Sequence, residues 1–282
     1  MASTLYLVAT PIGNLEDMTY RAVRILKEVD LIAAEDTRNS RHLLTHFDIH
    51  TPMTSYHEFN KIEKAEELLE KLLSGDDIAV ITDAGTPGIS DPGEELVRLC
   101  LSNNIKVSSV PGACAAVTAL TMSGQSARRF AFEAFLPKDK KELRRVLDEL
   151  KMETRTIIIY EAPHHLKKTL SLLESELGDR KLTITREITK LHEEAVVTTL
   201  SEAIGFYDEN EPRGEYVLVL AGRSKEEAMQ EKLAEFEGIS LDEHMDIYLK
   251  KGMDKKEAMK AVAKDRGVSK REIYKQLNQA ED

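Results

Sequence analysis

The sequence predicts an α/β protein built from two α/β domains and a small helical C-terminal domain. Short apolar runs that are typical of buried strands alternate with helical patterns over the first part of the chain. This alternation predicts a parallel sheet with helices on both faces. The strand-like run Asp77–Ile81 leads directly into Thr82–Gly93, which is rich in glycine and proline. Such a loop is typical of a small-molecule pocket at the carboxyl edge of a parallel sheet, although a surface turn is the alternative.

The first predicted domain covers residues 1–112. Its five strands are expected at 4–9, 30–34, 52–56, 77–82 and 105–110. Helical patterns at 61–73 and 94–103 lie between the later strands. The first strand runs into Thr10–Leu15, a loop that also contains glycine and proline. This predicts a second ligand-binding loop at the same edge of the sheet.

The second predicted domain covers residues 113–222. A run of small residues after Gly112 predicts a helix, which we take as the domain junction. Further helices are predicted at 142–150 and 165–176, and strands at 130–135, 156–160, 182–186, 195–200 and 216–220. The later strands follow one another closely, which favours antiparallel pairing and predicts a mixed sheet.

Residues 225–282 differ in character from the rest of the chain. Helix starts are predicted at Ser240, Asp254 and Ser269, because each lies three residues before a glutamate. Residues 250–275 hold 10 Lys or Arg against 4 Asp or Glu, whereas the whole chain has a formal net charge of -11. This local charge reversal favours RNA contact, with a solvated helical appendage as the alternative.

Composition limits the class of protein. A chain of 282 residues can bury more than one core, and its acidic net charge argues against broad nonspecific nucleic-acid binding. The two cysteines, Cys100 and Cys114, are too few for a metal cluster, and we expect no metal. No apolar run approaches the roughly 20 residues of a membrane span. The N-terminus has no signal-peptide pattern, so we expect a cytoplasmic protein that does not bind a membrane.

Three segments together carry a family resemblance: Val8–Leu15, Ala34–Arg38 and Thr82–Gly93. They closely resemble the tetrapyrrole-methylase-like class (class III) of S-adenosylmethionine-dependent methyltransferases. Further matches, in the expected order along the chain, are Val110–Ala113, Glu133–Lys138, Tyr160–His165, Arg186–Glu194 and Arg213–Val217. Within the class, the motifs are similar to those of bacterial enzymes that methylate a cytidine ribose 2′-oxygen in 16S ribosomal RNA of the small subunit. One departure is Ile188, where the family pattern has leucine.

The resemblance implies the tetrapyrrole methylase fold, with S-adenosylmethionine bound in a cleft between the two α/β domains. It also implies 16S ribosomal RNA or the small ribosomal subunit as partner, and a homodimer. Matching the motifs residue by residue gives the expected cofactor-binding residues Pro11, Gly13, Asp83, Gly85, Thr86, Gly88, Ile89, Ala115, Ala162 and Glu215. The chain has neither a dinucleotide fingerprint nor a phosphate-binding loop, so the cofactor must be held in another way.

The segment after the predicted strand 182–186 supplies the candidate catalytic residues Glu187, Lys190 and Arg186. Methyl transfer to a ribose hydroxyl is an in-line displacement that depends on alignment and is helped by a group that takes the hydroxyl proton. Glu187 could accept that proton, or Lys190 could if desolvation lowers its pKa. Arg186 could hold a phosphate. The alternative is an ion-paired loop that only joins strands.

RNA contact is expected from Asn14, Arg38, Arg41 and His42, because the loop 35–38 follows a strand at the same edge as the cofactor loops. An exposed helix start is the alternative for Arg41 and His42.

Two other functions stay open at this point. One is a tetrapyrrole C-methyltransferase, which the basic tail disfavours. The other is a noncatalytic RNA-binding or ribosome-assembly module, which would leave the glycine loops unexplained.

Overall fold

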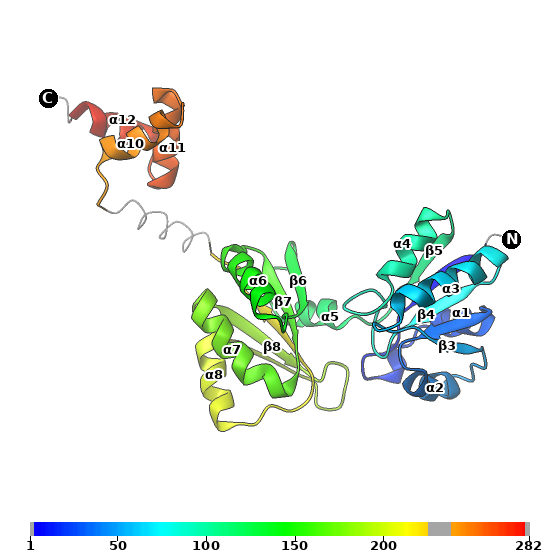
Figure 1. The fold of residues 1–282 in the computed structure, drawn as a ribbon. Helices are drawn as coiled ribbons and strands as arrows, with labels where there is room; N and C mark the ends of the chain where they lie inside the picture. Colours follow the sequence, from blue (N-terminus) through cyan, green and yellow to red (C-terminus); the bar gives the residue numbers. More distant parts are fainter. Residues whose placement is uncertain (1–2, 225–237, 280–282) are drawn as a thin grey trace. The chain divides into compact units, whose positions relative to one another are not determined.

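The computed structural model describes residues 3–224 and 238–279 (Figure 1). The chain forms two compact units, of which the first joins Met1–Lys151 with Arg155–Ala221 and the second joins Met152–Thr154 with Gly222–Asp282. Part of the predicted basic tail, residues 225–237, lies outside the described residues. No described helix combines the length and the apolar character needed to cross a membrane.

The first sheet of the larger unit has five parallel strands in the order β3-β2-β4-β1-β5. The strands are β1 Thr4–Val8, β2 Leu31–Ala34, β3 Met53–Ser55, β4 Ile78–Ile81 and β5 Lys106–Val110. All five predicted strands are confirmed, each slightly shorter than predicted. The order places β4 between β2 and β1, so the loops after these three strands leave the sheet side by side.

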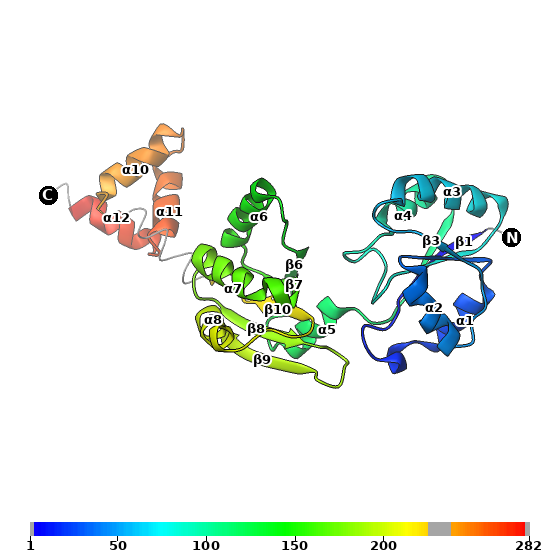
Figure 2. The ribbon, with the colours of Figure 1, turned by 60° about the horizontal axis from the view of Figure 1, so that its bottom comes forward.

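Helices cover both faces of this sheet, as predicted (Figure 2). Side chains alternate along β4, so that Ala79 and Ile81 pack with one pair of helices while Ile78 and Val80 pack with the other. The first pair is α1 Tyr20–Glu28 and α2 Thr37–His46, and the second is α3 Lys61–Ser74 and α4 Glu94–Ser102. A short 3-10 helix, η1 Leu15–Asp17, precedes α1. Burial on both faces explains why the central strand β4 is continuously apolar.

The second sheet is mixed, which confirms the prediction. Its order is β6-β7-β10-β8-β9, with β6 parallel to β7 and every other pair antiparallel. The strands are β6 Phe130–Phe135, β7 Thr156–Glu161, β8 Lys181–Arg186, β9 Glu194–Thr199 and β10 Tyr216–Leu220. The predicted strand at 195–200 ends one residue early, because Thr199 caps the next helix in a capping box with Glu202.

Among the described residues, four helices pack on the second sheet. On one face lie α6 Lys140–Met152, α7 Pro163–Leu177 and α8 Leu200–Glu209. On the other face lies α5 Ala115–Met122, whose Ala116, Ala119 and Leu120 pack against Ile158 and Val219. Helix α5 follows β5 in the chain but packs on the second sheet. The chain therefore passes from the first half of the larger unit, which contains the first sheet, to the second half, which contains the second sheet, just before α5. The boundary predicted near residue 112 is compatible with this path and stays a prediction.

The smaller unit contains α10 Leu241–Lys250, α11 Lys255–Asp265 and α12 Lys270–Gln279. The predicted helix starts are confirmed, because Ser240 and Asp254 form capping boxes and Ser269 exchanges hydrogen bonds with Glu272. Its apolar core contains Met245, Ala258, Met259, Val262, Ala263 and Ile273.

Candidate active site

The loops after β1, β4 and β5 are tied together by hydrogen bonds at the carboxyl edge of the first sheet. The backbones of Thr10 and Gly85 exchange two bonds, with N···O distances of 2.9 and 3.1 Å. The Thr10 hydroxyl also donates to the Thr82 carbonyl at 3.1 Å. The Thr86 hydroxyl donates to the Ala113 carbonyl at 2.9 Å, which joins the β4 loop to the segment after β5. The glycine-rich loop is therefore held in a defined conformation at this edge.

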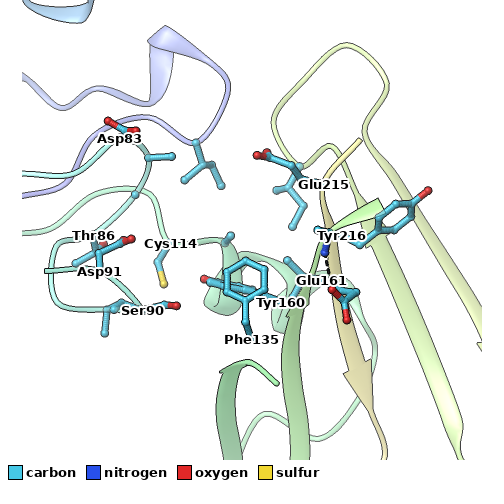
Figure 3. A pocket seen from close by; sticks show the side chains of 18 of the residues that line it. Asp83, Thr86, Ser90, Asp91, Cys114, Phe135, Tyr160, Glu161, Glu215 and Tyr216 are labelled. Atoms are coloured by element: carbon cyan, nitrogen blue, oxygen red, sulfur yellow. Dashed lines mark hydrogen bonds between the residues drawn. The ribbon is translucent and has the colours of Figure 1, made fainter. Parts of the chain in front are cut away.

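A cavity of about 440 Å³ opens beside these loops (Figure 3). Both halves of the larger unit contribute to its walls. The first half supplies Ile12, Glu35, Asp83, Ala84, Gly85, Thr86, Ile89, Ser90 and Asp91. The later residues in the lining are Cys114, Ala115, Phe135, Tyr160, Glu161, Ala162, Pro163, Ile188, Glu215, Tyr216 and Val217. A volume of this size is typical of small-molecule sites.

The cavity brings together most of the residues predicted to bind the cofactor. Its lining contains Asp83, Gly85, Thr86, Ile89, Ala115, Ala162 and Glu215. Pro11, Gly13 and Gly88 are not among the lining residues. Gly13 lies instead against the side chain of Lys190, where a Cβ on Gly13 would be 2.5 Å from Cγ of Lys190. A cofactor contact at Gly13 therefore stays a prediction, and its close neighbour in the structure is a protein side chain.

Three carboxylates lie at one end of the cavity, and two of them, Glu35 and Asp91, were not predicted as site residues. The Asp83 backbone N–H donates to Glu35 at 3.3 Å, and the Asn39 amide donates to the Asp83 carboxylate at 3.2 Å. Burial, followed by repulsion from Glu35 and Asp83, raises the pKa of Asp91 to about 7. Asp91 comes from the same loop as Asp83, and its place in Thr82–Gly93 was the available sequence signal.

An aromatic wall, which the sequence analysis missed, stands across the cavity from Asp91 (Figure 3). The ring of Phe135 meets that of Tyr160 at a centroid distance of 5.7 Å. The pairing of β6 with β7 shifts register between Phe132 and Phe135, and Ala134 there has a left-handed backbone with φ 51°. Burial raises the pKa of Tyr160, whose hydroxyl oxygen accepts a 3.0 Å bond from the Ala116 backbone N–H. Tyr160 is therefore a neutral, fixed part of the wall.

The predicted catalytic residues Glu187 and Lys190 form one ionic cluster with Glu215. Lys190 Nζ donates to Glu187 Oε1 at 3.0 Å and to Glu215 Oε2 at 2.7 Å. The Glu215 backbone N–H donates to the same Glu187 oxygen at 2.9 Å. Among residues 3–224 and 238–279, none donates to Glu187 Oε2. Because Glu215 and Ile188 both line the cavity, this cluster lies at its rim.

Hydrogen bonding fixes the charges of this cluster. The bond from the Glu215 backbone, together with the partner Lys190, holds the pKa of Glu187 below its usual value. Partial burial lowers the pKa of Lys190, but its bonds to Glu215 and Glu187 outweigh this effect, so the net pKa lies above the usual value. The condition under which Lys190 could act as a neutral base is therefore not met. Lys190 is a cation beside two carboxylates.

Arg186, the third predicted catalytic residue, pairs with Glu194 at 2.8 Å. Its Nε is buried without a hydrogen-bond partner among the described residues.

The carboxylate of Glu161 is occupied by hydrogen bonds within the protein. It accepts from the Ala162 backbone at 2.7 Å and from the Thr169 hydroxyl at 2.5 Å. Glu161 therefore supports the start of α7. His164 is exposed on that helix and lies outside the cavity lining.

The residues predicted to contact RNA all follow β1 or β2. Asn14 caps η1 by accepting from the Glu16 backbone N–H at 3.0 Å. The expectation of a loop throughout 35–38 is corrected, because Asp36 caps α2 and Arg38 lies in the first turn of that helix. The Asp36–Arg38 pair, at 2.8 Å, lowers the pKa of Asp36 to about 2. Arg41 and His42 are exposed in the second turn of α2, past the helix start, and both side chains are accessible, so their contact with RNA stays a prediction.

No group of three or more His, Cys, Asp or Glu side chains in the described parts of the chain could hold a metal ion.

Sequence comparisons identify the family of the chain. Residues 4–204 match the family of tetrapyrrole (corrin/porphyrin) methylases. A Bacillus subtilis (strain 168) protein named ribosomal RNA small subunit methyltransferase I is 49% identical, over 96% of this chain and 92% of the relative. A relative of the same name from a Synechocystis species is 47% identical, over 96% of this chain and 95% of the relative.

Solved structures show the same fold. A diphthine synthase aligns with a TM-score of 0.61 and 11% identity, over 77% of this chain and 89% of its own. A Thermus thermophilus uroporphyrin-III C-methyltransferase, whose structure holds S-adenosyl homocysteine, aligns with a TM-score of 0.54 and 18% identity, over 78% of this chain and 97% of its own. On the sequence match over residues 4–204 and the close relatives, the chain belongs to the tetrapyrrole methylase family of S-adenosylmethionine-dependent methyltransferases.

Proposed function

We propose that this protein transfers a methyl group from S-adenosylmethionine to the ribose 2′-oxygen of a cytidine in 16S ribosomal RNA of the small ribosomal subunit. The observation that carries the proposal is the Lys190–Glu215 ion pair of 2.7 Å, because Glu215 also lines the cavity. A charged cluster able to act on an acceptor hydroxyl thus adjoins a cavity able to hold a cofactor. The relatives' name supports ribosomal RNA as the substrate, at 40–49% identity over nearly the whole chain.

The lining of the cavity fits S-adenosylmethionine. The carboxylates of Glu35 and Asp83 provide negative charge for a cationic ligand, and Ile12, Val217 and the aromatic wall provide apolar surface. When bound, this cofactor supplies an electrophilic methyl group on a sulfonium. The proposed contacts are the seven predicted residues in the lining, together with Pro11, Gly13 and Gly88 in the adjoining loops.

Glu187 and Lys190 are the proposed catalytic residues. The ribose hydroxyl must lose its proton as the new oxygen–carbon bond forms, and Glu187 Oε2 is available to orient the hydroxyl and accept that proton. The low pKa of Glu187 keeps it ionised before transfer. Lys190, held as a cation, stabilises negative charge that develops on the acceptor oxygen. Arg186 lies next in sequence and is proposed to hold a phosphate of the RNA.

RNA contact is proposed from Asn14, Arg38, Arg41 and His42, and from the basic helices α11 and α12. Exposed cations on these helices include Lys255, Lys256, Lys260, Lys264 and Arg271. The chain would act as a homodimer, which would enlarge the RNA-binding surface. A ribosomal substrate would also place the protein in the cytoplasm.

The test is methyl transfer from labelled S-adenosylmethionine to small ribosomal subunits and to naked 16S RNA, followed by digestion and mass spectrometry of nucleosides. The expected product is 2′-O-methylcytidine. A methyl on a base, or on a tetrapyrrole carbon when a tetrapyrrole is offered, would refute the substrate assignment. RNA binding without any methyl transfer would favour the noncatalytic ribosome-assembly alternative.

A further inference from the structure

Two glycines, one from each half of the larger unit, lie against the Glu187–Lys190 pair. A Cβ on Gly214 would lie 2.6 Å from Glu187 Cγ and 2.7 Å from its Cδ and Oε1. A Cβ on Gly13 would lie 2.5 Å from Lys190 Cγ and 2.9 Å from its Cε. Carbon atoms in good contact are about 3.5–4.0 Å apart, so there is no room for a side chain at either position.

Glu187 is not free to move away from an added methyl group at Gly214. Its Oε1 accepts hydrogen bonds from Lys190 and from the Glu215 backbone, at 3.0 and 2.9 Å. Its own backbone is left-handed, with φ 51°, and its N–H donates to the Glu215 carbonyl at 3.0 Å. The closest approach is to Cγ, near the backbone, so turning the carboxylate alone does not relieve the clash.

Lys190 is held in a similar way. Its Nζ is fixed between Glu187 and Glu215, while the stem of its side chain crosses Gly13. The preceding residue, Thr189, is also left-handed, with φ 69°. Left-handed non-glycine residues such as these are sparse and concentrate at functional sites.

We propose that Gly214 and Gly13 are positioning residues for methyl transfer, because a glycine at each position leaves the space that the side chain of Glu187 or Lys190 occupies. This inference rests on the proposed catalytic role of that pair. Gly214 sets the position of the Glu187 carboxylate. Gly13, in the loop after β1, contacts the aliphatic part of the Lys190 side chain and sets its position. Gly13 thereby links the loop beside the cofactor cavity to the residues that act on the acceptor hydroxyl.

The experiment compares each glycine with a matched control that has positive φ but open space. Gly214, with φ 82°, pairs with Gly178, with φ 77°, and Gly13, with φ 154°, pairs with Gly75, with φ 111°. A Cβ on either control glycine would meet nothing within 4 Å. Alanine at the control therefore carries the backbone cost alone, whereas alanine at Gly214 or Gly13 adds the clash.

Three quantities are measured on the full chain: S-adenosylmethionine affinity, the single-turnover methylation rate, and the pKa of Glu187 from carboxyl NMR titration. Gly214→Ala should raise the pKa of Glu187 toward its usual value and slow single turnover by about 100-fold, while cofactor affinity stays nearly constant. Gly178→Ala should change neither the pKa nor the rate. Gly13→Ala should slow single turnover in the same way relative to Gly75→Ala.

Equal effects of Gly214→Ala and Gly178→Ala on the pKa and the rate would overturn the inference. If the wild-type protein methylates no ribosomal RNA, the proposed function fails. The pKa of Glu187 in Gly214→Ala still decides whether Gly214 positions the Glu187 carboxylate. If Gly214→Ala alone does not fold, the double variant with Glu187→Ala removes the clashing atoms and should recover folding. Failure of that double variant to fold would also overturn the inference.

Discussion

Lys190 Nζ lies 2.7 Å from Glu215 Oε2, and this ion pair joins the segment after β8 to the residue just before β10. Glu215 also lines the cavity, while its backbone N–H donates to Glu187 at 2.9 Å. One residue therefore connects the cavity wall to both proposed catalytic side chains. A change in the Glu187–Lys190 pair should consequently affect methyl transfer more than cofactor binding.

Glu187→Gln and Lys190→Met should each lower the single-turnover rate more than they lower cofactor affinity. The first removes the proton acceptor and the second removes the cation that stabilises the acceptor oxygen, so both losses fall on the chemical step. Rapid-quench kinetics and calorimetry measure the two quantities. Lys168→Met, at an exposed position on α7, is the matched control. Normal single-turnover rates in both variants would remove these residues from the catalytic assignment.

Asp83→Ala should weaken S-adenosylmethionine binding by about 1–3 kcal/mol, because it removes a polar group that faces the ligand. Asp83 is exposed in the lining of the cavity and its carboxylate is oriented by Asn39, so the substitution leaves the core intact. Calorimetry gives the affinity, and circular dichroism checks that the variant is folded. Asp208→Ala, on the exposed surface of α8, is the control. Unchanged affinity in a folded Asp83 variant would show that the pocket is wrongly placed.

Asp91 should make the protein less stable as pH rises from 3.8 to about 7. Burial and the neighbouring carboxylates raise its pKa from 3.8 to about 7, so in this window the folded protein keeps a proton that the unfolded chain has released. Raising the pH therefore favours unfolding. Asp91→Asn should flatten this part of the pH profile, measured by chemical denaturation, whereas Asp148→Asn on the surface of α6 should not. An identical profile in the Asp91 variant would contradict the raised pKa.

Neutralising Lys255, Lys256 and Lys260 by glutamine should weaken RNA binding and flatten its salt dependence. Each lysine that pairs with a phosphate should, when neutralised, reduce the slope of log K against log salt by about 0.7–0.9. Cofactor affinity should stay nearly constant, because these exposed side chains belong to α11 in the smaller unit. Glutamine at Lys140, Lys141 and Lys151 on α6 removes equal charge as a control. An unaltered salt slope would favour the solvated-appendage alternative.

The strands, the mixed second sheet and the C-terminal helix starts could be predicted from the sequence because each depends on short-range patterns. The apolar run of β4 and the Ser240–Glu243 capping pair are examples, since the residues that interact lie within a few positions of one another. Helix α8 carried a similar signal, a threonine three residues before a glutamate at Thr199, but the apolar residues before it favoured a longer strand.

The sequence by itself determined the α/β class and the loops after β1 and β4 that line one side of the cavity, because glycine and proline after buried strands specify loops at the carboxyl edge. Only the tertiary structure decided which side chains meet there. Gly13 touches Lys190, Gly214 touches Glu187, and Asp91 faces Glu35, although each pair is separated by many residues in the chain. These contacts depend on strand order and on left-handed backbone at Glu187 and Thr189, and no local pattern specifies either. The charge states of Asp91 and Lys190 follow from the same contacts, because burial and hydrogen-bond partners set a pKa only once the chain is folded.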